Sequence, residues 1–139
     1  MTAQDRALAT AMFGLHREIR LLHGTIARRF EVTTQQVELL CALPGREPSF
    51  GELAGLLGCD KTNVTGMVDR LARKGYLSRE PCPADRRVIR VVLTDEGKAL
   101  GERIREAVTK ELAARLPRTG RRELTATLQA VVTALHESR

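Results

Sequence analysis

Two short amphipathic segments joined by a tight turn constrain the fold of this chain more than any other feature. Ser49 and Glu52 form a capping box that starts the first segment, and Gly58 ends it. The residues of this segment expected to face inward are Leu53, Leu56 and Leu57. Asp60 is a good N-cap for the second, whose apolar residues recur at the spacing of one helix face: Val64, Met67, Val68 and Leu71. So short a turn between two helices is typical of a helix-turn-helix.

Further helices are predicted on both sides of this pair. Residues 4–29 carry a 3.5-residue apolar repeat, which usually packs along another helix: Leu8, Met12, Leu15, Ile19, Leu22 and Ile26. Thr33 and Gln36 form a capping box for a helix that ends at Pro44-Gly45. Thr94 opens a helix that runs to about Leu116, and a last amphipathic helix follows Gly120.

Two strand-like stretches, 76–80 and 88–93, interrupt the helices and are joined by PCPADRR at 81–87. Two strands alone are marginally stable, so this hairpin must lean on the helices. A tip between strands is exposed, so its charges do not build a core. The predicted fold is mainly α, with six helices and a small β-hairpin.

Charge is concentrated in the same region. Of a net charge of +6, the span from Cys59 to Thr94 carries +4, from eight basic and four acidic residues. This bias favours an anionic partner, and nucleic acid is the first candidate.

Several classes of protein are disfavoured. No apolar run approaches the roughly 18 residues of a membrane span, and the start lacks the layout of a secretory signal, so we expect a cytoplasmic protein with no membrane partner. Three widely spaced cysteines give neither a disulfide framework nor a zinc ribbon, and no metal or cofactor is expected. No phosphate loop, nucleophile motif or acid/base pair indicates an enzyme.

The helix that follows Asp60 carries a polar face opposite its apolar stripe. At about 100° per residue, this face holds Thr62, Gly66, Asp69 and Arg73, flanked by Thr65 and Arg70. Lys61, Thr62 and Asn63 stand at the helix N-terminus, where backbone N–H groups favour phosphate. Hydroxyl and amide groups interleaved with arginine suit the reading of base edges, and Lys74 extends the basic surface.

Residues 33–97 resemble the DNA-binding region of the MarR family of bacterial transcriptional regulators. The matching pieces are TTQQVELL (33–40), ELAGLLG (52–58), KTNVTGMVDRLARKGYL (61–77), DRRVIRVVLT (85–94) and EGK (96–98). The resemblance implies a winged helix-turn-helix over 33–94. It also implies a dimerisation helix over 1–32 and C-terminal dimerisation helices over 95–139.

The resemblance assigns roles in the wing. An arginine of the tip, Arg86 or Arg87, is similar to the family residue that enters the DNA minor groove, whose negative potential attracts it. Asp85 is expected to orient a neighbouring arginine. Asp69 is similarly expected to pair with Arg70, Arg73 or a wing arginine. Gly66 departs from the family pattern, which commonly has a larger and often basic residue there. Glycine at this position permits a close approach of the backbone to DNA; the plainer interpretation, which we favour, is one base contact fewer and a different operator preference.

The implied function is sequence-specific binding of double-stranded operator DNA by a homodimer that pairs through its terminal helices. We expect a repressor that binds a pseudo-palindromic operator and is released by a small phenolic or aromatic acid. His16, Arg20 and His23 are candidates for the effector site, and packing in a dimer interface explains them equally well.

Three alternatives stay open. Cys82, with Arg79, Arg86 and Arg87 nearby, is a candidate for a thiol redox sensor, although the peroxide-sensing branch of the family has its cysteine in the first helix and this chain has none there. The other two are a non-specific architectural DNA-binding protein and a protein-interaction module. Cys41 and Cys59 are expected to be small core residues.

Overall fold

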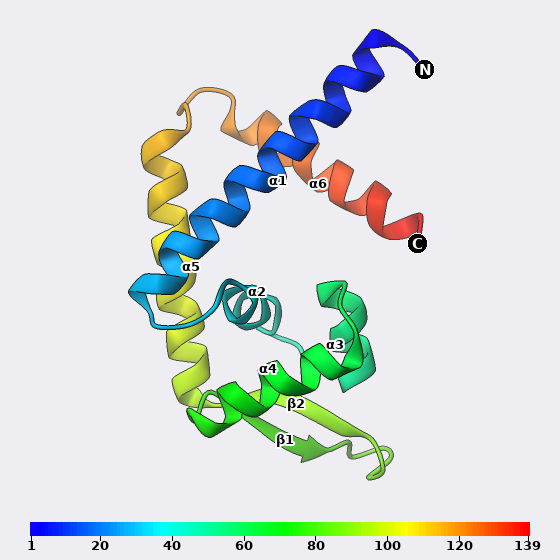
Figure 1. Ribbon diagram of the computed structural model, residues 1–139, viewed down its shortest axis with the longest axis vertical. Coiled ribbons are helices and arrows are strands. Elements are labelled where there is room, and N and C mark those ends of the chain that lie inside the picture. Colours follow the sequence, from blue (N-terminus) through cyan, green and yellow to red (C-terminus); the bar gives the residue numbers. More distant parts are fainter. The chain divides into compact units, whose positions relative to one another are not determined.

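The computed structural model describes residues 1–139, which form six helices and a two-stranded antiparallel sheet (Figure 1). In chain order the elements are α1 (Ala3–Arg29), α2 (Thr34–Ala42), α3 (Phe50–Leu57), α4 (Lys61–Arg73), β1 (Leu77–Pro81), β2 (Ile89–Leu93), α5 (Asp95–Arg115) and α6 (Arg121–Glu137). The chain divides into two compact units, Met1–Val108 and Thr109–Arg139. No helix combines the length and apolar character needed to span a bilayer.

The helix starts follow from side-chain caps. The predicted capping box of Thr33 and Gln36 is present, and it explains why Gln36 is the polar side chain buried in the core. Ser49 accepts the Glu52 N–H at 3.2 Å, but Glu52 does not reciprocate, so the capping box predicted there is only half formed. Thr2 and Asp5 form a further capping box at the start of α1 that the sequence analysis did not predict.

The core of the first unit gathers one face from each of its helices. Ile26 of α1, Leu40 of α2, Leu53 of α3 and Leu71 of α4 are fully buried, and the predicted stripe of α4 is buried throughout. Gly58 adopts the left-handed conformation (φ 65°) that ends α3 at the predicted position.

Two apolar predictions are corrected. Leu56, expected to face inward from α3, is exposed, because Leu53 occupies the inner face of this short helix. The repeat of α1 is buried only at its C-terminal end, by Leu22 and Ile26, whereas Leu8 is 63% exposed. The N-terminal part of this seam is therefore not part of the buried core of the first unit.

Each strand of the hairpin is attached to the helical part of the first unit. Leu77 pairs with Leu93 and Pro81 with Ile89 in its antiparallel register, and β1 lies beside α4 (Figure 1). The Val91 N–H donates to the Pro48 carbonyl at 2.8 Å, which fixes β2 to the segment leading into α3. These contacts make the hairpin part of the helical unit, as two isolated strands require.

The second unit consists of the end of α5 and all of α6. No residue of α6 is buried, and its apolar side chains are exposed: Leu124, Leu128, Val132 and Leu135. The predicted amphipathic pattern of this helix is present, but its apolar face is not buried.

Candidate nucleic-acid interface

Helix α4 presents the polar face that the sequence predicts. Asp60 caps it by accepting the Asn63 N–H at 2.8 Å, so the N–H groups of Lys61 and Thr62 are left without an intrahelical acceptor. Six of the candidate DNA-binding residues on this helix are exposed: Lys61, Thr62, Asn63, Thr65, Arg70 and Arg73. Their exposure follows from the burial of the opposite stripe, which leaves the helix no freedom to rotate.

Thr65 has a restricted hydrogen-bonding role. Its hydroxyl donates to the Lys61 carbonyl one turn earlier, at 2.8 Å. With its proton used inside the helix, the oxygen is left as an acceptor. An acceptor at this position suits the amino group of adenine or cytosine in a major groove.

Gly66 leaves room beside Arg70. A Cβ added at Gly66 would meet only the Arg70 guanidinium, 3.7 Å away. The structure therefore places no neighbour that requires glycine here, and Arg70 lies over the space that a larger side chain would share.

Asp69 joins the recognition helix to the wing. Its carboxylate forms an ion pair with the Arg79 guanidinium of β1, and both side chains are about 40% exposed. Asp69 was predicted to pair with Arg70, Arg73 or a wing arginine. Arg79 was not among the predicted DNA-binding residues. Arg79 lies two residues after the buried Leu77 and therefore on the same face of β1. The packing of β1 against α4 brings it to Asp69.

The wing tip holds one arginine in place. The Arg87 Nε and Nη2 atoms donate to the two carboxylate oxygens of Asp85, at 3.1 and 3.3 Å, and the Arg87 backbone N–H donates at 3.2 Å. These hydrogen bonds from Arg87 hold the pKa of the Asp85 carboxyl below its ordinary value. The Arg87 side chain is nevertheless 91% exposed, and Arg86 beside it is exposed as well.

Lys74 lies at the C-terminal end of the same surface. Its ammonium donates to the Glu31 carbonyl at 3.1 Å, which links the end of α4 to the turn between α1 and α2. A shallow groove beside it is lined by Arg70, Arg73 and Lys74 and by residues of that turn. All these basic groups belong to the first unit, so the recognition helix and the wing form one surface.

The other candidates lie elsewhere. His16 and Arg20 are exposed on α1, and His23 is half-buried with its Nδ1 atom lacking a hydrogen-bond partner. Cys82, expected to be exposed, is half-buried, and its backbone N–H donates to the Val88 carbonyl at 2.7 Å. Cys41 and Cys59, expected in the core, are only half-buried. Burial raises the pKa of the Cys41 thiol, which disfavours its reactive thiolate.

The chain was compared with known proteins. Residues 32–89 match the model of the MarR family. Over 97 residues the chain is 34% identical to the transcriptional activatory protein BadR of Rhodopseudomonas palustris, which covers 65% of this chain and about half of BadR (55%). Over 100 residues it is 32% identical to the multiple antibiotic resistance protein MarR of Escherichia coli, which covers 71% of this chain and 69% of MarR. The crystal structure of wild-type apo MarR from E. coli matches with a TM-score of 0.77 at 26% identity, covering 89% of this chain and 95% of that chain.

Helix α4 buries one face and exposes a polar one, and an ion pair connects it to a hairpin with basic residues. With α3 before it, this arrangement is that of a winged helix-turn-helix protein. The similarity to MarR-family proteins in both sequence and fold identifies the family of the chain. The chain belongs to the MarR family, whose members are non-enzymatic DNA-binding transcriptional regulators. The predicted family and fold class are confirmed.

Proposed function

We propose that this chain regulates transcription by binding a pseudo-palindromic operator as a homodimer, with α4 in the major groove and the wing in the adjacent minor groove. The observation that carries the proposal is the Asp69–Arg79 ion pair, which joins the base-reading helix and the wing into one surface. A surface that reads two grooves at once needs a fixed relation between its two parts.

Contacts to DNA divide between the two ends of α4. Lys61, Thr62 and Asn63 stand at the N-terminus, where the helix dipole favours phosphate and base edges are within reach. Thr65 and Arg70 contact bases from the middle of the helix, and Gly66 contributes no side chain. Arg73 and Lys74 contact the phosphate backbone, which positions the protein but carries no sequence information.

Arg87 is the wing residue assigned to the minor groove. Its hydrogen bonds to Asp85 hold the guanidinium in one orientation, so less conformational entropy is lost on binding. Arg86 has no such partner and contacts phosphate. Asp85 acts by orienting Arg87, since its own charge repels the DNA backbone.

Dimerisation is assigned to the terminal helices. Exposed apolar side chains on α1 and α6, including Leu8, Leu128 and Val132, are surfaces that a second copy would cover. Residues 1–32 and 95–139 are thus assigned to dimerisation, and residues 33–94 to DNA binding. A two-fold dimer places its recognition helices about 34 Å apart, which matches successive major grooves of a pseudo-palindrome.

The regulator is assigned as a repressor that a small phenolic or aromatic acid releases. BadR is named for activation, so the sign of control is a separate question from DNA binding. An effector acts only by differential affinity for the DNA-bound and free geometries.

Fluorescence anisotropy tests this function. Labelled DNA from upstream of the chain's own gene and a scrambled duplex are titrated at two salt concentrations, with Arg73→Ala as the test variant and Arg118→Ala as a matched arginine control. We expect preference for the upstream DNA at one dimer per site, weakened by Arg73→Ala and unchanged by Arg118→Ala. Equal, salt-sensitive binding to every sequence in a random pool indicates an architectural protein, and no DNA binding by an intact dimer indicates a protein-interaction module.

A further inference from the structure

The side chain of Arg70 on α4 folds back along the helix toward its N-terminus. Both Nη atoms of its guanidinium lie 3.7 Å from the point where a Cβ at Gly66 would stand. A side chain in a helix covers the turn that precedes its own Cα, so residues four apart share one face. The charged end of Arg70 is thus displaced by about one helical turn, with its pitch of 5.4 Å, toward the N-terminal half of α4.

Gly66 leaves the space that the Arg70 guanidinium occupies. The three atoms nearest to an added Cβ at this glycine all belong to that guanidinium. A methyl group would touch the guanidinium at an ordinary van der Waals distance, whereas the further atoms of a longer side chain would compete with it for the same space. The position of the Arg70 guanidinium therefore depends on a small residue at 66.

The hydrogen-bond donors of Arg70 are left for a partner outside the chain. Asp69, the acidic residue next to it, is paired with Arg79 of β1. The acidic residue of the wing tip, Asp85, is paired with Arg87. Arg70 takes part in none of the ion pairs of the chain, and its side chain is exposed. Its guanidinium therefore presents five N–H donors in a planar fork.

We propose that Arg70 reads a guanine in the major groove from the space over Gly66, an inference that rests on the proposed function and deepens it. Guanine has two acceptors, O6 and N7, on its major-groove edge, and the guanidinium fork donates to both at once. Adenine has one acceptor beside an amino donor, thymine has one acceptor, and cytosine has only a donor there. Arg70 therefore selects guanine over the other three bases.

The displacement of the guanidinium decides between a base and a phosphate. In helix-turn-helix proteins the N-terminal residues of the recognition helix contact base edges. The charged end of Arg70 lies beside Gly66, in this half of α4, although its Cα belongs to the C-terminal half. Arg73 has Asp69 rather than a glycine one turn before it. No glycine offers Arg73 the same position, and its assignment to the phosphate backbone stands.

A selection of duplexes from a random pool, repeated with variants of the chain, shows which base pair each residue reads. We expect the parent chain to enrich a guanine in each half-site that Arg70→Ala no longer enriches, with unchanged preferences at the other positions. Arg73→Ala is expected to weaken binding to all sequences and to keep this guanine, because a phosphate contact carries no sequence information. Arg118→Ala, an exposed arginine between α5 and α6, is the matched control and is expected to select like the parent chain.

Base analogues in the selected duplex test the contact itself. 7-Deazaguanine lacks the N7 acceptor in the major groove, whereas inosine lacks only the amino group in the minor groove. At the guanine assigned to Arg70, we expect 7-deazaguanine to weaken binding of the parent chain about tenfold and inosine to change it by less than about twofold. Arg70→Ala is expected to bind the guanine and 7-deazaguanine duplexes equally. Anisotropy titrations measure these affinities.

Two substitutions of different size test the role of Gly66. Gly66→Ala is expected to keep the guanine preference, because the added methyl group only touches the Arg70 guanidinium. Gly66→Leu is expected to lose this preference as fully as Arg70→Ala, because its side chain takes the space of the guanidinium. In the Arg70→Ala background, Gly66→Leu is expected to alter the preference at this base pair no further. Circular dichroism confirms that each variant is folded.

The outcomes that overturn this inference differ from those that overturn the proposed function. A uniform loss of affinity in Arg70→Ala, with the guanine still preferred, makes Arg70 a phosphate contact. An equal effect of 7-deazaguanine on the parent chain and on Arg70→Ala assigns that guanine to another residue, and a retained preference in Gly66→Leu removes the role of the glycine. In all three cases an operator is still selected, so the proposed function stands. Failure of the intact parent dimer to enrich any sequence sinks both.

Discussion

Asp69 of the recognition helix and Arg79 of the first wing strand form an ion pair on the face assigned to DNA. The pair neutralises an acidic group that would otherwise repel phosphate, and it spans the two elements that must enter neighbouring grooves. Both side chains are partly exposed, so the pair contributes little to folding stability, about 0–1 kcal/mol. The ion pair instead fixes the position of β1 relative to α4.

A double-mutant cycle tests this role. Asp69→Asn and Arg79→Gln are each expected to weaken operator binding several-fold, because either one removes the ion pair that orients the wing relative to α4. The double variant is expected to be no weaker than the worse single variant, giving a coupling of about 1 kcal/mol. Affinities for operator and scrambled DNA are measured by anisotropy, and strictly additive losses would show that the residues act independently.

The Asp85–Arg87 contact gives a second prediction. Arg87→Ala is expected to cost about 1–3 kcal/mol of operator binding and to lower the salt slope by about one. Asp85→Asn is expected to reduce the preference for operator over scrambled DNA while raising binding to both, since it removes a repulsive charge and the orientation of Arg87. Titrations over a series of salt concentrations measure both quantities, and an effect of Arg86→Ala larger than that of Arg87→Ala would reassign the minor-groove residue.

The pH dependence of this contact follows from the lowered pKa of Asp85, which Arg87 causes. A depressed carboxyl pKa gives an interaction that is complete above the ordinary value of about 3.9 and is lost as pH falls through the lowered value. Preference for operator DNA is therefore expected to be constant between about pH 5 and 8 as far as Asp85 is concerned. A carbon-13 NMR titration of the Asp85 carboxyl gives its pKa directly, and an ordinary value would contradict the hydrogen bonds seen here.

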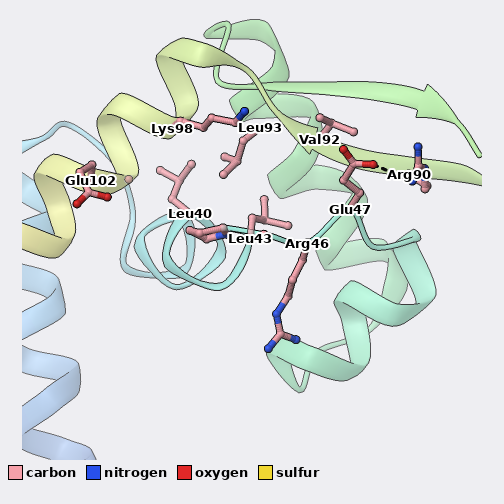
Figure 2. Close-up of a pocket in the computed structure, with 12 residues that line it drawn as sticks. Leu40, Leu43, Arg46, Glu47, Arg90, Val92, Leu93, Lys98 and Glu102 are labelled. Carbon is pink, nitrogen blue, oxygen red and sulfur yellow. Dashed lines mark ion pairs between the residues drawn. The ribbon is translucent and has the colours of Figure 1, made fainter.

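Structural features that depend on residues close in the sequence could be predicted, whereas contacts between distant elements could not. Caps and apolar spacing predicted α2 and α4 closely, because Thr33 and Asp60 bond to backbone groups only three residues away. Asp69 was predicted to pair with Arg70, Arg73 or a wing arginine. The choice among them could not be predicted, because it depends on the packing that places Arg79 of β1 against α4. A cavity between α2, β2 and the start of α5 (Figure 2) was missed for the same reason, since α2 is far from the other two elements in the sequence.

Gly66→Ala is expected to stabilise the protein without changing operator affinity. An added methyl meets only the Arg70 guanidinium, and alanine is favoured over glycine in a helix by about 1 kcal/mol. Gly55→Ala in α3, where an added Cβ would meet no atom within 4 Å, is the matched control and should give a similar gain in thermal unfolding. A loss of affinity of more than about tenfold for Gly66→Ala alone would mean that the DNA approaches the α4 backbone at this glycine.

Cys82→Ser separates the ligand-controlled regulator from a thiol switch. Cys82 lies half-buried at the wing tip, and its thiol forms no disulfide. We expect hydrogen peroxide to leave operator affinity unchanged in both the parent chain and Cys82→Ser. Release of DNA by peroxide that Cys82→Ser abolishes, with Cys41→Ser as the control that retains it, would establish the redox alternative.

Gly97→Ala is expected to be the most damaging of the glycine substitutions. Gly97 lies in the first turn of α5, where its N–H donates to the Thr94 hydroxyl, and Thr94 in turn donates to the Gly75 carbonyl at 2.6 Å. A Cβ at Gly97 would lie 2.0 Å from the Tyr76 carbonyl oxygen, so the backbone at the base of the wing would have to move.

Overpacking of this kind typically lowers the free energy of unfolding by about 1–3 kcal/mol. Gly55→Ala in α3 is expected to raise it instead. Because the shift falls where β1, β2 and α5 meet, the wing is displaced from α4, and operator affinity is expected to fall even in the folded fraction. Urea unfolding followed by circular dichroism measures the first effect, and anisotropy at a temperature well below the unfolding midpoint measures the second. Unchanged stability in Gly97→Ala would mean that the close approach of α5 to Tyr76 is absent from the protein in solution.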